Sequence, residues 1–244
     1  MKRTIIASVL MLMSVFAFGQ KADTRLFEMR IYYPEAGKMA DMQSRFRNHT
    51  LKLFEKHGMT NIGYFVPQRK PDSVLIYILA FKDRAQRDSS WKAFGADLNW
   101  KSVQSESEKN GKLIKKIDQY FLTTTDFSPN DLNKGSGVFE LRTYKASPYN
   151  LGLLMARFRN HTVKIFEKHG MKNHIYWNQV GKDDMLIYLL SHANKEAAKV
   201  SFDAFRLDPD WLSAREASEK LAKGSITTSV VSEFLIPTDF SPWK

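Results

Sequence analysis

The sequence carries the same segment twice. The fifteen residues RFRNHTLKLFEKHGM at Arg45–Met59 return as RFRNHTVKIFEKHGM at Arg157–Met171, with thirteen identical and both changes aliphatic for aliphatic. Shorter matches at nearly the same spacing flank this block, including two TDFSP segments at Thr125–Pro129 and Thr238–Pro242. Such a duplication predicts two copies of one fold unit. Two copies are too few for a solenoid, so they favour a fused dimer with pseudo-two-fold symmetry.

Each copy predicts the element order β-α-β-β-α-β, which is the ferredoxin-like arrangement. Residue alternation predicts strands at 25–33, 61–67, 73–81 and 114–122 and at 138–144, 172–180, 185–192 and 226–236. Apolar residues at helical spacing predict helices at 39–57 and 83–110 and at 149–169 and 195–223. We therefore expect an α+β fold in which two tandem ferredoxin-like repeats form an intramolecular dimeric α+β barrel, whose closure protects the sheet edges.

The predicted boundaries follow composition. Residues 1–20 combine Lys2 and Arg3 with an uncharged apolar run and a small-x-small site at Ala17–Gly19, which is typical of a signal peptide. Repeat 1 is expected at 21–127, a polar linker at 128–137 and repeat 2 at 138–244. We expect export to the periplasm or the medium, with retention of the leader as a membrane anchor as the alternative. No other stretch is apolar enough to span a bilayer.

Composition excludes some classes of function. The chain has no cysteine, so thiol chemistry is excluded. Its net charge of +11 falls to +9 without the two leader cations, and the remaining basic residues are scattered. A nucleic-acid binder would more often show a dense basic stripe and a recognisable module, so we expect no nucleic-acid partner.

The segments FEMRIY, RFRNHTLKLFEKHGM and LIYIL resemble the NIPSNAP family, and the resemblance extends along nearly all of the mature chain. It implies the dimeric α+β barrel fold, often with two such domains in one chain. Animal members of this family are tied to mitochondria, vesicle transport and mitophagy signalling. A secretory leader stands here in place of an Arg-rich transit peptide, so those roles are not expected of this chain.

Four histidines are the candidate catalytic residues. His57 and its twin His169 lie on the apolar stripe of the first helix of each repeat, and His49 and His161 lie at its edge. A histidine facing the sheet can act as an acid–base near neutral pH. In related haem-degrading monooxygenases and chlorite dismutases a helical histidine holds haem, so His57 and His169 are candidate haem ligands by analogy of fold. The sequence itself requires no cofactor and predicts no other metal. Alternatively, both histidines bond to backbone at the helix end.

The first strand of each repeat supplies the candidate ligand-binding residues. Glu28, Arg30 and Tyr32 alternate with an apolar set and therefore share one face, as do their counterparts Glu140, Arg142 and Tyr144. If the apolar set faces the helices, the polar set points into the barrel, where it could hold an anion. The alternative is that the charges pair internally.

Two functions remain open. The leading hypothesis is binding of a small hydrophobic or aromatic molecule between sheet and helices, with aromatic residues such as Trp91 lining the pocket and cofactor-free or haem-linked oxygenase chemistry. The alternative is a non-catalytic interaction module of the cell envelope that associates further with itself or a partner. The repeats differ where Arg215 replaces Gln104 and His192 replaces Phe81. Such differences would mark a repeat that has kept chemistry.

Overall fold

The computed structural model describes residues 23–132 and 137–244. The predicted signal peptide lies outside the described residues, and so does part of the predicted linker. Within the described residues, no helix has both the length and the apolar character needed to cross a membrane.

Both repeats show the predicted order of elements. Repeat 1 contains β1 (Leu26–Pro34), α1 (Met39–Arg45), η1 (Phe46–Thr50), α2 (Leu51–Lys56), β2 (Thr60–Pro67), β3 (Leu75–Phe81), α3 (Arg84–Ala96), α4 (Leu98–Ser107) and β4 (Ile114–Thr124). Repeat 2 contains β5 (Val138–Ala146), α5 (Leu151–Arg157), η2 (Phe158–Thr162), α6 (Val163–Lys168), β6 (Lys172–Gln179), β7 (Met185–His192), α7 (Lys195–Leu207), α8 (Pro209–Ala222) and β8 (Thr227–Pro237).

Two departures from regular helix recur in both repeats. The first helix is interrupted by a π-helical turn, η1 or η2, over the identical segment FRNHT. The second helical region breaks at Asp97 or Asp208, whose backbone is extended and whose side chain accepts hydrogen bonds from the first amides of the next helix. An aspartate in this N-cap position explains why α3 and α4 are separate helices.

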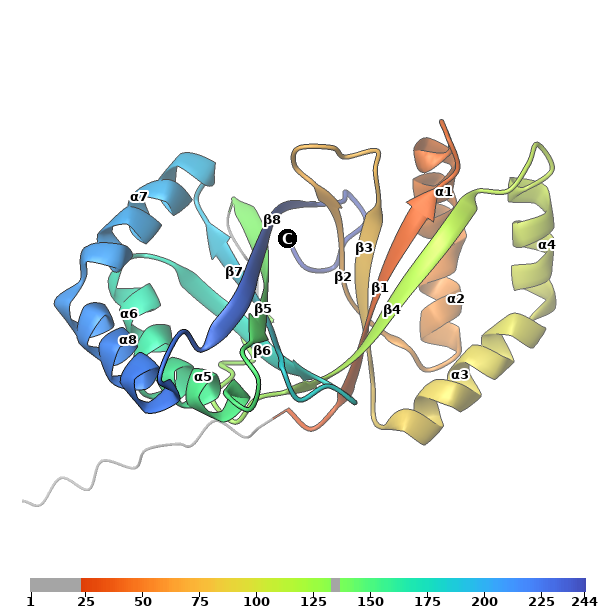
Figure 1. Cartoon of the computed structure of the whole chain (residues 1–244). Helices are drawn as coiled ribbons and strands as arrows, with labels where there is room; N and C mark the ends of the chain where they lie inside the picture. Colours follow the sequence, from red (N-terminus) through yellow and green to blue (C-terminus); the bar gives the residue numbers. More distant parts are fainter. Residues whose placement is uncertain (1–22, 133–136) are drawn as a thin grey trace, which may run out of the picture.

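The strands close into one barrel in the order β1-β3-β2-β8-β5-β7-β6-β4. Within each repeat the sheet is antiparallel, and the two half-sheets join where β2 pairs with β8 and β4 pairs with β6. Figure 1 shows the helices of the two repeats on opposite outer sides, with the strands between them. The predicted intramolecular dimeric α+β barrel is confirmed.

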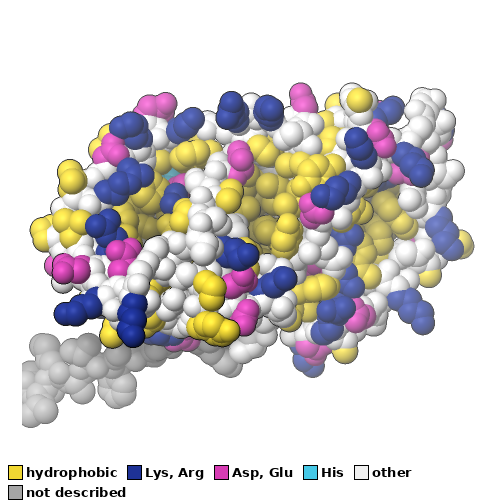
Figure 2. All heavy atoms as spheres, viewed as in Figure 1, with side chains coloured by type: hydrophobic (Ala, Val, Ile, Leu, Met, Phe, Trp, Pro, Cys, Tyr) yellow, Lys and Arg dark blue, Asp and Glu magenta, His cyan; other side chains and the backbone are white. Residues whose placement is uncertain are grey.

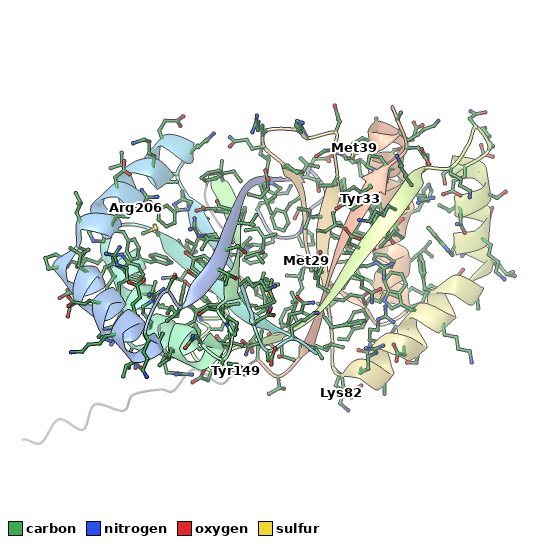
Figure 3. All side chains as sticks on the ribbon, in the orientation of Figure 1. Met29, Tyr33, Met39, Lys82, Tyr149 and Arg206 are labelled. Carbon is green, nitrogen blue, oxygen red and sulfur yellow. The ribbon has the colours of Figure 1, made fainter. Side chains whose placement is uncertain are left out.

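The faces of the first strand are the reverse of the expected ones. Phe27 and Met29 lie inside the barrel, in a core that also contains Phe139 and Trp177 of repeat 2. Glu28, Arg30 and Tyr32 face the helices instead, and Figure 3 places Met29 between the half-sheets and Met39 on the helix side. Alternation shows which residues share a face but not which layer that face meets. The barrel interior is lined from both repeats and takes the apolar set.

The C-terminal tail of each repeat packs on the other repeat. Thr125 N–H donates to the Tyr176 carbonyl at 2.9 Å, and Thr238 N–H donates to the Tyr64 carbonyl at 2.9 Å. Two ion pairs at 2.6 Å repeat this exchange, Arg159 with Asp126 and Arg47 with Asp239. Near the end of the second tail, Trp243 lies inside the barrel core. The tails therefore close one end of the barrel and hold the repeats together.

Candidate functional site

The π-helical turn of repeat 1 follows directly after an arginine, Arg45, whose side chain reaches α4. The Thr50 hydroxyl donates to the Arg45 carbonyl at 3.2 Å, and the turn leaves Arg45, Phe46 and Thr50 all buried. A π-helical turn adds one residue to the helix and is frequent at functional sites. Arg45 is only 3% exposed, although it lies on a helix of the outer layer.

Arg45 lies among aromatic rings and one carboxylate. Its Nη1 donates to Glu108 Oε1 at 2.9 Å and to Ser107 Oγ at 3.2 Å. Its guanidinium lies 5.2 Å from the ring centroid of Trp100, a geometry that permits cation–π attraction. The Nε of Arg45 is buried, and none of the described residues accepts a hydrogen bond from it.

These residues border a cavity of about 460 Å³ between the sheet and the helices of repeat 1. Its volume lies in the range common for small-molecule sites. Six aromatic side chains form its walls: Tyr32, Phe46, Phe54, Trp91, Phe94 and Trp100. Its polar groups come from α1, α4 and the start of β4: Arg45, Gln104, Glu108, Lys112, Lys115 and Lys116. The lysines are exposed, so the cavity is aromatic inside and positively charged at its mouth.

Trp91 is held in the cavity wall by a buried carboxylate. Its indole Nε1 donates to Glu28 Oε2 at 2.9 Å. Glu28 also accepts from Arg87 Nε at 2.8 Å and from Arg30 Nη1 at 2.6 Å. Burial alone would raise the pKa of Glu28, but the hydrogen bonds and charges of Arg87 and Arg30 hold it below its usual range. Glu28 and Arg30 are thus paired internally, the second of the two predicted alternatives, whereas Tyr32 and Trp91 line the cavity.

Repeat 2 keeps the buried carboxylate and changes its partners. Glu140 accepts from Arg142, from Ser232 and from His192 Nε2, the last at 2.8 Å. Ala198 and Phe202 stand where repeat 1 has Arg87 and Trp91, so α7 supplies no donor to this carboxylate. Arg142 also donates to the hydroxyls of Tyr188 at 2.9 Å and Tyr144 at 3.1 Å.

The buried arginine of repeat 2 has lost its carboxylate. Arg157 Nη1 donates to Ser218 Oγ at 3.2 Å, and its guanidinium lies 4.8 Å from the Trp211 ring centroid. Glu219, the counterpart of Glu108, instead forms an ion pair at 3.9 Å with Arg215, which stands where repeat 1 has Gln104. Burial lowers the pKa of Arg157 below its ordinary value.

The candidate histidines lie at the ends of the first helices. His57 Nε2 lies 2.7 Å from Asp97 Oδ2, and His169 Nε2 lies 2.6 Å from Asp208 Oδ2. Each histidine thus meets the aspartate that caps the next helix, and not the backbone as the alternative had proposed. Hydrogen bonds from Lys56 and His57 hold the pKa of Asp97 well below its usual range. His49 and His161 are exposed.

A haem held by His57 or His169 does not fit this arrangement. The Nε2 of each ring is engaged by an aspartate, and neither ring lines the cavity of repeat 1. Within the part of the chain that the structure describes, no group of three or more histidine, aspartate and glutamate side chains is placed to hold a metal ion.

Sequence reasoning missed the central residues of the cavity. Arg45 and Glu108 were not among the candidates, because their contact depends on how α1 packs against α4. One signal was present: Arg45 and Arg157 open the most strongly repeated segment, at a helical position among apolar residues. The sequence shows the Gln104/Arg215 difference, but it does not show that this difference decides the partner of the nearby carboxylate, Glu108 or Glu219.

The closed barrel of two ferredoxin-like halves, with a cavity between sheet and helices, defines a dimeric α+β barrel protein. The NIPSNAP family model matches residues 27–129 and, separately, residues 139–242, which is one match for each repeat. The chain therefore belongs to the NIPSNAP family. A search of curated proteins found no match.

Two solved structures with TM-scores above 0.5 share the fold at low sequence identity, and a third is similar over one repeat's length. A candidate monooxygenase of Lactobacillus acidophilus is 13% identical with a TM-score of 0.55, covering 88% of this chain and 94% of its own. A candidate monooxygenase of Fusobacterium nucleatum is 9% identical with a TM-score of 0.57, covering 88% and 92%. A NIPSNAP family protein of Agrobacterium tumefaciens is 21% identical with a TM-score of 0.39, covering 43% and 93%.

Proposed function

We propose that repeat 1 binds a small planar aromatic molecule carrying an anionic group, in the cavity between its sheet and helices. The observation that carries this proposal is the combination of six aromatic walls with a buried guanidinium and exposed lysines around one cavity. Aromatic walls favour a flat apolar body through area burial and stacking geometry. The surrounding cations favour a negative charge at its edge.

The interior of the cavity is prepared for such a ligand before it binds. Glu28 fixes the indole of Trp91 from behind, and Arg30 lies 4.4 Å from the centroid of the same ring. Held side chains lose little conformational freedom on binding, which improves affinity. Glu108 pairs with Arg45 and would compete with an anionic ligand for it.

Repeat 2 is not expected to bind the same ligand. Phe202 cannot donate a hydrogen bond as Trp91 does. The longer Arg215 also stands at the position where the shorter Gln104 borders the repeat 1 cavity, and so takes up space there. Two structural neighbours are described as candidate monooxygenases. A second measurement is therefore whether the protein consumes oxygen when a ligand is bound.

The first experiment is calorimetric titration of the leaderless protein with 2-naphthoate, a planar aromatic carboxylate. We expect one saturable site. Glu108→Gln should tighten binding about fivefold, because it removes a competing negative charge beside Arg45. The matched change Glu219→Gln in repeat 2 should have no effect. Absence of saturable binding, or equal effects of the two variants, would overturn the proposal.

Export is a separate proposal and rests on the N-terminal sequence. Fusion of residues 1–24 to a reporter enzyme that works only outside the cytoplasm should give activity. Substituting Lys2 and Arg3 by glutamate should reduce this activity. A reporter that stays inactive would contradict export.

A second candidate function is self-association through the helices of repeat 2. Four large apolar side chains are exposed on α7 and α8: Val200 at 69%, Leu207 at 77%, Leu212 at 40% and Leu221 at 71%. Among the described residues of the repeat 1 helices, only Leu98 is comparably exposed. Of the four side chains in repeat 2, Val200 and Leu207 are seven positions apart and share one face of α7, which favours docking of a second copy. Light scattering should show an oligomer that Leu207→Glu disrupts and Leu98→Glu does not; a monomer at all concentrations would exclude this function.

A further inference from the structure

A second cavity, of about 570 Å³, lies at the other end of the barrel from Trp243 and is lined by both repeats. Figure 2 shows hydrophobic side chains gathered in a hollow between the two halves of the molecule, and Figure 3 places Met29 there. This cavity is separate from that of repeat 1, because its walls are the inner faces of the strands.

The cavity lies on the pseudo-two-fold axis. Strands β1 and β5 run in the same direction around the closed barrel, so the axis relating the repeats runs along the barrel. The wall is accordingly built from pairs of equivalent residues, most of them apolar: Met29 with Leu141, Val74 with Met185, and Ile76 with Ile187. A dimer of two identical chains would have to present the same side chain twice at every such position.

The fused chain differs at several of these pairs, and one difference places a charge in the wall. Tyr120 pairs in register with Met29, and at the equivalent place in repeat 2 Glu233 pairs with Leu141. Both side chains line the cavity. Glu233 is half-buried, and its side chain forms no ion pair or hydrogen bond in the described part of the chain. This carboxylate faces Tyr120 across a cavity whose inner wall is mostly apolar and whose rim holds Arg69 and Lys70.

A carboxylate in such a place selects its ligand by charge. Covering Glu233 with an alkyl chain would remove it from water without compensation, which is costly. Covering it with an ammonium group forms an ion pair, and the Tyr120 ring can add cation–π attraction. The same argument disfavours fatty acids, although Arg69 and Lys70 lie at the rim. Both rim cations are exposed, so salt screens their repulsion of an entering ammonium.

We propose that the open end of the barrel binds an organic ammonium with an apolar body, with Glu233 as its counter-ion. The cationic end lies against Glu233 and Tyr120, and the apolar body lies along Met29, Leu141 and Ile187. A carboxylate at the outer end of such a molecule would add affinity through Arg69 and Lys70.

Calorimetry of the leaderless protein with octylammonium and with octanoate tests this proposal at physiological salt. Octylammonium should bind at one site at least tenfold more tightly than octanoate. Hexyl- and butylammonium should bind progressively more weakly, by roughly three- to fourfold for each methylene removed. Equal binding of the two octyl probes, tighter binding of octanoate, or no binding of either would overturn the proposal.

Two substitutions locate the bound ammonium. Glu233→Gln preserves side-chain shape and should weaken octylammonium at least tenfold, whereas Glu196→Gln, the same charge change on exposed α7, should not. Tyr120→Leu should weaken it about threefold. Octylammonium binding that is insensitive to Glu233→Gln would overturn the proposal. Binding of 2-naphthoate should be unaffected by Glu233→Gln, so the two cavities can be tested separately.

Discussion

The two repeats retain the same buried glutamate on their first strands but hold it from different directions. In repeat 1, Arg87 and Trp91 reach Glu28 from helix α3. In repeat 2, His192 on β7 and Ser232 on β8 reach Glu140 from within the sheet. A buried carboxylate must be satisfied, but the fold allows either layer to supply the donors. The difference matters for the helix layer, because only in repeat 1 does a tryptophan of that layer donate a hydrogen bond to the sheet.

The second contrast concerns the buried arginines. Glu108 pairs with Arg45 in repeat 1, whereas Glu219 pairs with Arg215 in repeat 2 and leaves Arg157 with a serine. The replacement of Gln104 by Arg215 is sufficient to account for the exchange. Duplicated scaffolds can therefore diverge at a cavity through one side chain while the backbone stays the same.

The largest expected effect is a loss of stability on replacing either buried glutamate, Glu28 or Glu140. Glu28→Gln leaves the Arg30 guanidinium without a counter-charge and Arg87 with only the exposed Asp88, and should lower the free energy of unfolding by about 3–5 kcal/mol. Glu140→Gln leaves one guanidinium, that of Arg142, without its ion pair and should cost about 1–3 kcal/mol. Urea denaturation measures both. Equal losses of unfolding free energy would show that stability does not depend on whether the helix layer or the sheet supplies the donors.

A smaller effect is expected from making repeat 1 resemble repeat 2. Gln104→Arg should place a longer side chain in the cavity, in the space that the aromatic rings of the ligand need. This steric loss should outweigh the gain from drawing Glu108 away from Arg45. Binding of 2-naphthoate should weaken about tenfold, or about 1.4 kcal/mol. Arg215→Gln should leave that binding unchanged. A Gln104→Arg variant that binds normally would contradict the importance of this position.

The π-helical turns should respond alike in both repeats. Thr50→Val and Thr162→Val each remove a hydroxyl bonded at 3.2 Å to the carbonyl of the buried arginine. Each should lower the free energy of unfolding by about 1 kcal/mol. The measurement is again urea denaturation, and clearly unequal losses would show that the turn has diverged as well.

The smallest contrast concerns acid stability. Asp97 and Asp208 both have pKa values lowered below the ordinary 3.8, chiefly by hydrogen bonds from Lys56 and Lys168 and then from the histidines. Each binds a proton less readily in the folded state, so stability rises with pH below about 4 and is lost as pH falls. Asp97→Asn and Asp208→Asn should flatten this acid slope equally. Denaturation midpoints between pH 2 and 5 would show any difference.

The repeat, the element order and the closed barrel could all be predicted, because they follow from duplication and from local periodicity. The orientation of the first strand could not be predicted, since alternation does not say which side of the sheet excludes water more completely. The partners of His57 and Arg45 lie 40 and 63 residues away, and both contacts depend on where α4 packs. Predicted internal pairing of Glu28 and Arg30 was correct because the residues are neighbours on one face.

The exchanged tails have a consequence for synthesis on the ribosome. Tyr64 N–H donates to Ser241 Oγ at 2.9 Å, a contact that joins residues 177 positions apart. Until β8 has emerged, β2 has only one neighbouring strand, and until residues 238–243 follow, the end of the barrel near Phe65 is uncovered. Contacts of such long range form late and slowly, and open strand edges invite aggregation. Repeat 1 should therefore depend on chaperones during translation, and on the last few residues for release from them.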